Sequence, residues 1–187
     1  MLAKLFNRFS KYQRKNDQRN FLTALIKNPN VHFGENICLG QTDINLETNT
    51  CSLYLGDRFY TRAFCSIRVG DNGRLTIHPN VFWNNGCSVN CMYEVEIGEN
   101  VMFGESVKIY DHNHEITKGP TISISREKLN YGRVIIGKNT WLGANVIILK
   151  GVTIGENVVI GANCLIYKDI PANSIVKNAA QLTITTI

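Results

Sequence analysis

The 187-residue sequence contains no run of about 18 consecutive apolar residues, so it predicts no membrane-spanning helix. Nor does its start resemble a signal peptide, because Lys4 and Arg8 interrupt the apolar residues there. We therefore expect a cytoplasmic protein whose six cysteines are free, buried thiols. With 44% apolar and only 19% charged residues, the chain can bury a core and has the length of one domain.

Most of the chain has little net charge, which argues against nucleic-acid binding. The formal net charge is +5, but residues 1–28 hold seven Lys and Arg side chains and a single Asp. The remaining residues therefore sum to about −1, and a body with this balance carries no general signature of polyanion binding.

Apolar residues recur every six positions in the C-terminal half. One ladder is aliphatic: Ile136, Leu142, Ile148, Ile154, Ile160 and Ile166. A second ladder, two positions earlier, holds smaller residues: Val134, Thr140, Val146, Val152, Val158 and Cys164. Gly-x-Asn triplets follow the aliphatic position at 137–139, 143–145, 155–157 and 161–163, and a looser version of the rhythm runs from Val31 to Ile109.

A period of six matches neither the 3.6-residue period of a helix nor the two-residue period of a strand. It predicts very short strands joined by tight turns, in which Gly and secondarily Asn tolerate a positive φ. Three such strands per coil stack into a parallel β-helix, whose coils bury their apolar residues against one another. We therefore expect an all-β solenoid over residues 29–176, followed by a C-terminal segment, 177–187.

Residues 1–28 are predicted to form a basic amphipathic helix that ends before Pro29. Its apolar stripe begins with Leu2, Leu5 and Phe6. One interpretation is a helix that caps the open end of the solenoid. The other is a helix that lies on an anionic membrane surface, as a peripheral contact with the inner membrane face.

Residues 111–133 interrupt the repeat and are expected to form one long loop. The loop begins with the run from Asp111 to Glu115, which contains His112 and His114. A long loop on a rigid scaffold usually carries function. The spacing of Cys87 and Cys91 suggests metal binding, but no second Cys or His pair at zinc-site spacing accompanies them, so we expect no metal.

Five stretches resemble a known family: Val107–His114, Ile136–Ala144, Lys150–Gly155, Val159–Ala162 and Lys168–Pro171. In order and spacing they are similar to the hexapeptide-repeat galactoside and maltose O-acetyltransferases. They look closer still to the O-acetyltransferases that modify bacterial surface polysaccharides. The resemblance implies a left-handed β-helix, a homotrimer, acetyl-CoA as co-substrate and a sugar or glycan acceptor.

In that family a histidine at the root of the loop removes a proton from a sugar hydroxyl, which then attacks the thioester of acetyl-CoA. Imidazole suits this task because its unperturbed pKa of about 6.5 leaves it largely neutral at cell pH. An ungapped count from Ile97 places the family's base on His114, whereas His112 requires a shift of two positions and is the alternative. Asp111 or Glu115 either orients the imidazole or is a solvated loop charge.

The same count places the acceptor-binding amide of the family on Asn84, beside the aromatic Phe82, with Asn85 as the neighbouring alternative. A purely structural role of Asn84 in a turn is equally open. By resemblance, Trp141 lines an acetyl-CoA groove between adjacent subunits. Four small turn residues let the pantetheine arm lie against backbone, and Lys168 contacts a CoA phosphate. Those small residues are Gly143, Ala144, Gly161 and Ala162.

The C-terminal segment departs from the family pattern. Members usually end with Gly-x-Pro-Ala followed by Lys or Arg, whose cation contacts the CoA nucleotide. Here the chain reads Lys177-Asn-Ala-Ala-Gln181, so only Lys177 can supply that cation. The departure puts full CoA affinity in doubt.

Other classes of function fit the sequence less well. A γ-type carbonic anhydrase shares the solenoid but needs three zinc-binding histidines, two of them five residues apart, and the four histidines here include no such pair. An ice-binding solenoid would show flat rows of Thr. The closer rival is N-acetylation of a nucleotide-linked amino sugar.

Overall fold

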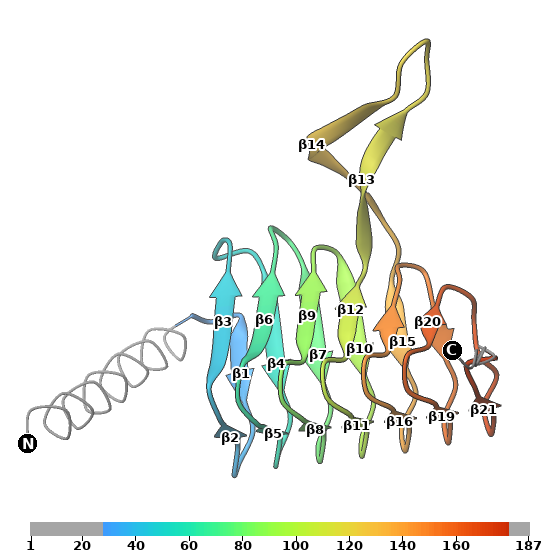
Figure 1. The fold of residues 1–187 in the computed structure, drawn as a ribbon. Helices are drawn as coiled ribbons and strands as arrows, with labels where there is room; N and C mark the ends of the chain where they lie inside the picture. The colour runs from blue at the N-terminus through green and yellow to red at the C-terminus, as the bar shows by residue number, and fades with distance from the viewer. Residues whose placement is uncertain (1–27, 180–187) are drawn as a thin grey trace, which may run out of the picture.

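A computed structural model describes residues 28–179, so the predicted N-terminal helix and the end of the C-terminal segment lie outside the described residues. The described chain winds into coils that each contribute strands to three parallel sheets (Figure 1). Within this range no helix is long and apolar enough to cross a bilayer. The predicted all-β solenoid is confirmed.

Neighbouring strands in each sheet come from successive coils. The first sheet consists of β1 (Val31–Phe33), β4 (Ser52–Leu55), β7 (Arg74–Ile77), β10 (Glu94–Ile97), β15 (Val134–Ile136) and β18 (Thr153–Ile154). The second consists of β2 (Cys38–Leu39), β5 (Tyr60–Thr61), β8 (Phe82–Trp83), β11 (Met102–Phe103), β16 (Trp141–Leu142), β19 (Val159–Ile160) and β21 (Ile175–Val176). The third consists of β3 (Thr42–Leu46), β6 (Cys65–Val69), β9 (Ser88–Cys91), β12 (Lys108–Tyr110), β17 (Ile147–Ile148) and β20 (Leu165–Ile166).

Both six-residue ladders point into the solenoid, as predicted. All of their members are buried, including Thr140, whose hydroxyl donates to the Gly155 carbonyl at 3.3 Å. In-register pairs such as Ile136 with Ile154 stack like residues from coil to coil. Each coil therefore buries its apolar residues only because its neighbours cover them.

In the turns, Gly and Asn have roles that differ from those predicted. Asn139 and Asn157, not the glycines two positions before them, adopt the left-handed conformation, with φ of 57° and 56°. The glycines are needed for close approach between coils. A Cβ on Gly143 would lie 2.6 Å from the backbone nitrogen of Ala162 in the next coil. Asn tolerates positive φ, whereas no residue larger than Gly fits against that backbone.

Two further expectations are corrected. The segment predicted as a loop forms an antiparallel hairpin, β13 (His112–Thr117) with β14 (Ser123–Tyr131), which projects from the stack of coils (Figure 1). Polar and apolar residues alternate in Ser123–Ser125 and again in Leu129–Tyr131, which suits a strand, and Gly119-Pro120 supplies the turn. All six cysteines are free, but Cys38 is exposed because it lies on the outer face of β2 in the N-terminal coil.

Candidate active site

The candidate residues gather along two different edges of the solenoid. Turns that join the second sheet to the third, here called the 2/3 edge, hold residues 84–87, 104–106, 143–145 and 161–163. Turns that join the third sheet to the first, the 3/1 edge, hold residues 92–93, 111–133 and 167–170. Asn84, Asn85 and the four small turn residues therefore share one edge, while His112, His114 and Lys168 share the other.

His112 is paired with a fully buried carboxylate. Its Nδ1 atom lies 2.9 Å from Oδ1 of Asp111, and its side chain is only 17% exposed. A carboxylate oxygen accepts hydrogen bonds, so Nδ1 carries the proton and the lone pair on Nε2 is available. Asp111 is itself held by two backbone N–H donors, from Met92 at 2.9 Å and Tyr93 at 2.7 Å. It is an orienting group and not a solvated loop charge.

His114 lies two residues further along β13 and is exposed. Its Nδ1 donates to the backbone carbonyl of Ser125 at 3.0 Å, across the hairpin. This contact also leaves Nε2 free to accept a proton. His114 thus has the same tautomer as His112, but its partner is neutral and its imidazole is in solvent.

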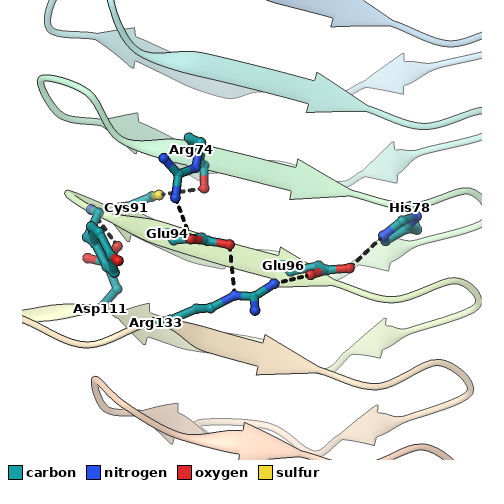
Figure 2. A network of polar contacts seen from close by, with 8 residues as sticks. Arg74, His78, Cys91, Glu94, Glu96, Asp111 and Arg133 are labelled. Atoms are coloured by element: carbon teal, nitrogen blue, oxygen red, sulfur yellow. Dashed lines mark hydrogen bonds and ion pairs between the residues drawn. The ribbon is translucent and has the colours of Figure 1, made fainter.

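The root of the hairpin is anchored to the coils by a chain of ion pairs across the first sheet (Figure 2). Arg133, immediately after the hairpin, reaches Glu94 at 2.8 Å and Glu96 at 2.7 Å. Glu94 also binds Arg74 at 2.6 Å, and Glu96 binds His78 at 3.0 Å. Sequence reasoning missed these ion pairs, because the paired residues lie up to 39 positions apart in the sequence and stand opposite each other only after the coils have stacked.

Other contacts hold the same root from the hairpin side. The N–H of Gly132 donates to the carbonyl of Asp111 at 2.8 Å, which closes the base of the hairpin. The rings of Tyr93 and Tyr131 lie 6.0 Å apart. Beside this root, the pKa of the Cys91 thiol is raised, mainly by burial and secondarily by the negative charge of Asp111. Cys91 therefore stays protonated at neutral pH. The structure therefore offers histidine and carboxylate, not a thiolate, for chemistry here.

On the 2/3 edge the two asparagines differ in how they are used. Asn85 is committed to the turn, because its Oδ1 accepts from Ala63 at 3.2 Å and its Nδ2 donates to Glu105 at 3.3 Å. Asn84 accepts at Oδ1 from its neighbour's N–H at 2.8 Å and from Arg62 at 3.3 Å. Within residues 28–179 its Nδ2 makes no hydrogen bond, so Asn84 has the amide donor available for a ligand.

Trp141 and Phe82 lie on the outer face of the second sheet. Trp141 is 50% exposed and pairs in register with Met102, which pairs in turn with Phe82 and then Tyr60. These four residues, Tyr60, Phe82, Met102 and Trp141, are called the outer stripe. Because adjacent coils are about 4.8 Å apart, the stripe extends about 14 Å along the solenoid. It runs beside the 2/3 edge and ends near the predicted cofactor residues.

The small turn residues predicted to contact CoA stack on one another along the 2/3 edge. The N–H of Gly143 bonds to the Ile160 carbonyl at 2.7 Å, and that of Asn163 bonds to Ala144 at 2.8 Å. Beyond them, an open pocket of about 320 Å³ is lined by Asn163, Leu165, Val176 and Lys177, among others. Lys177 is thus at the end of the line of small residues. Lys168 is exposed on the 3/1 edge, with its Nζ 5.5 Å from the centre of the Tyr167 ring.

Within residues 28–179, no three His, Cys, Asp or Glu side chains are grouped closely enough to hold a metal ion.

Residues 133–168 match a family model described as bacterial transferase hexapeptide (six repeats). The chain is 31% identical over 134 residues to the polysialic acid O-acetyltransferase of Neisseria meningitidis, covering 70% of this chain and 60% of that protein. It is also 31% identical to a putative lipopolysaccharide biosynthesis O-acetyl transferase of Escherichia coli K12, covering 68% of each.

Solved structures show the same solenoid. A maltose O-acetyltransferase from Clostridium difficile 630 is 30% identical, with a TM-score of 0.54, over 88% of this chain and 72% of that one. The N-acyltransferase AntD from Bacillus cereus, in complex with dTDP-4-amino-4,6-dideoxyglucose and coenzyme A, has a TM-score of 0.62. It is 21% identical over 77% of each chain, so that likeness concerns the fold alone.

Proposed function

Since this chain belongs to the hexapeptide-repeat acyltransferases, we propose that it transfers an acetyl group from acetyl-CoA to a hydroxyl of a sugar acceptor. The relatives named as polysialic acid and lipopolysaccharide O-acetyltransferases support a role in surface polysaccharide biosynthesis. The left-handed sense of the coil is part of the same proposal. The observation that carries it is the contact between Asp111 and His112 at the root of the projecting hairpin.

In the proposed reaction, Nε2 of His112 removes the proton from the sugar hydroxyl as its oxygen attacks the thioester carbonyl carbon. The tetrahedral intermediate collapses, the carbon–sulfur bond breaks, and the CoA thiolate takes the proton back from the imidazolium. Asp111 holds the imidazole in the required tautomer and stabilises its positive charge in the intermediate. A backbone N–H in the CoA groove stabilises the oxyanion.

The two histidines differ in their hydrogen-bond partners. The family count favours His114, whereas the geometry favours His112, because a buried carboxylate fixes its ring and a neutral carbonyl holds that of His114. Fixing a base in the productive orientation is part of what a catalytic site supplies. We therefore propose His112 as the base and His114 as a residue that lines the acceptor side of the hairpin.

Acetyl-CoA is proposed to lie along the 2/3 edge, beside the Trp141 end of the outer stripe. Glycine and alanine at 143–144 and 161–162 leave room for a pantetheine arm against the backbone, and Trp141 offers an exposed ring beside them. The pocket at Lys177 then receives the nucleotide, with Lys177 in place of the cation that the family has at the position of Gln181. Lys168, on the 3/1 edge, is proposed to meet a phosphate from a neighbouring subunit's groove.

We propose a homotrimer, and the separation of these groups within one chain supports it. His112 is on the 3/1 edge and Trp141 is on the second sheet, so the third sheet separates them within one chain. We propose that each active site combines the hairpin of one subunit with the groove of the next. In a closed ring of three identical subunits, symmetry repeats this contact three times.

N-acylation of a nucleotide-linked amino sugar is the second candidate, and the likeness of the fold to the N-acyltransferase AntD favours it. A thiol-release assay with acetyl-CoA separates the two when sugars with free hydroxyls are compared with amino sugars linked to a nucleotide. If neither kind of acceptor leads to release of CoA, and no CoA binding is measurable, the acyltransferase proposal is contradicted altogether.

Residues 1–28 are proposed as a peripheral contact with the inner face of a membrane, where lipid-linked glycans are built. The seven cations there each add about 1 kcal/mol of attraction to an anionic leaflet. Co-sedimentation with anionic vesicles at low salt tests this. Binding that is unchanged in a chain lacking residues 1–28 contradicts the membrane contact and favours the alternative, in which this segment caps the solenoid.

A further inference from the structure

A cationic and aromatic patch lies beside the proposed acceptor residue Asn84, in the same coil and in the preceding one. The rings of Tyr60 and Phe82 are stacked, with centroids 5.6 Å apart and planes 11° from parallel. The guanidinium carbon of Arg62 is 5.8 Å from the centre of the Phe82 ring. Arg62 also donates to Oδ1 of Asn84 at 3.3 Å. We call Tyr60, Arg62 and Phe82 the Arg62 patch.

The charge of Arg62 is not neutralised by any carboxylate among residues 28–179. Arg68, Arg74 and Arg133 all form ion pairs with glutamates in that range. Arg62 instead contacts the Phe82 ring and the amide oxygen of Asn84. The Glu105 carboxylate, on the same edge, accepts a hydrogen bond from Asn85. A guanidinium positioned by stacking keeps further N–H donors for an anionic ligand.

The position of the patch points to the acceptor and not to the cofactor. Along the outer stripe, Trp141 marks the proposed CoA end and Tyr60 the opposite end, with Phe82 between them. An acceptor whose hydroxyl reaches Asn84 therefore extends over Phe82 toward Tyr60. Tyr60 is 42% exposed, so part of its ring is accessible for contact with a sugar.

We propose that the Arg62 patch is an acceptor subsite that binds an anionic group on the sugar, with Arg62 as the anion ligand and Tyr60 and Phe82 as the aromatic surface beside it. The inference rests on the proposed function and adds the substrate class. The anion is either the carboxylate of an acidic sugar or the phosphate of a nucleotide-linked sugar, since both fit a guanidinium in the same way.

The test compares acceptors that carry the anionic group with acceptors that lack it. One arm uses uronic and sialic acid oligomers against their carboxyl-reduced, neutral forms. The other uses a nucleoside diphosphate sugar against the free sugar. In Arg62→Gln we expect KM for the anionic acceptor to rise by about 10- to 100-fold, because a hydrogen bond to a charged group is lost. KM for the neutral acceptor and for acetyl-CoA stays unchanged. The arm that shows the effect identifies the source of the anion.

Arg58→Gln is the matched control. Arg58 also lacks an ion pair within the described chain and donates across one coil to an asparagine, Asn80, at 2.5 Å, but it has no aromatic partner and lies at the turns joining the first sheet to the second. It should leave every kinetic constant near the wild-type value. Equal effects of the two variants, or an equal loss for charged and neutral acceptors in Arg62→Gln, overturn the subsite.

Direct binding separates the subsite from the acetyl-transfer proposal. Saturation-transfer NMR with the acidic oligomers and the nucleoside diphosphate sugar needs no acetyl-CoA. Binding that is lost in Arg62→Gln, without any turnover, supports the patch and contradicts the transferase proposal. Turnover with no difference between charged and neutral acceptors supports the transferase and overturns the patch. Absence of both binding and turnover contradicts both.

Discussion

Nδ1 of His112 lies 2.9 Å from Oδ1 of Asp111, and the aspartate is fully buried while the imidazole edge reaches solvent. The carboxylate is fixed from behind by the N–H groups of Met92 and Tyr93 in the preceding coil. The orientation of the ring is therefore set by the solenoid itself, through a residue at the point where the hairpin leaves it. A rigid support of this kind suits a catalytic base better than a mobile loop does.

Asp111→Asn is expected to lower kcat by about 10²- to 10⁴-fold, because an amide can donate to Nδ1 and reverse the tautomer of His112. Binding of acetyl-CoA should be unchanged. Nitrogen-15 NMR of the imidazole gives a second measurement, in which the proton moves from Nδ1 to Nε2. Normal kcat with a reversed tautomer contradicts the role assigned to His112.

His112→Ala and His114→Ala separate the two candidate bases. We expect the first to lower kcat by about 10²- to 10⁴-fold and the second to lower it far less, since only His112 has the carboxylate partner. Calorimetry with CoA should show normal binding in both variants. The reverse order of the two effects restores the assignment from the ungapped family count.

The six-residue ladders predicted the solenoid and its core because burial repeats with the coil, and a repeat is visible in the sequence alone. The ion pairs of Arg133 were not predictable in the same way, because the partner glutamates belong to an earlier coil and the inserted hairpin hides the register. The prediction that the glycines adopt the positive φ was wrong for a related reason. Conformational preference is local, whereas the approach of the neighbouring backbone depends on the finished stack.

Arg133→Gln is expected to loosen the hairpin without unfolding the coils. Loss of its contacts with Glu94 and Glu96 removes about 1–2 kcal/mol of local stability, which corresponds to about 5- to 30-fold faster amide exchange in residues 112–131. Hydrogen exchange with mass spectrometry measures this. Arg68→Gln, which removes an ion pair with Glu47 far from the hairpin, is the control. Equal exchange in the two variants argues against an anchoring role for Arg133.

Gly98→Ala tests the close approach between coils outside the proposed active site. An added Cβ would lie 2.6 Å from the Lys138 nitrogen and 2.9 Å from the Gly137 carbonyl carbon, and neither backbone atom can move alone. We expect a loss of about 1–3 kcal/mol in the free energy of unfolding, the usual cost of overpacking. Gly119→Ala in the hairpin turn, where the nearest atom is 3.7 Å away, should be close to neutral in the same chemical denaturation experiment.

Subunit mixing tests whether each active site is shared between chains. One parent carries His112→Ala together with His114→Ala, which removes both candidate bases, and the other carries Trp141→Ala in the proposed groove. Each parent is expected to be nearly inactive at low acetyl-CoA. If the base and the groove come from neighbouring subunits, unfolding and refolding an equal mixture rebuilds some sites with both wild-type residues.

Random assembly places an intact base next to an intact groove in about one site in four, so the mixture should recover about a quarter of the wild-type activity. The recovery requires exchange of subunits, so parents refolded separately and then combined serve as the control. If base and groove belong to one chain, no assembly can join the intact halves, and the activity of the refolded mixture stays at the mean of the two parents. That result contradicts the shared site, even where light scattering shows a trimer.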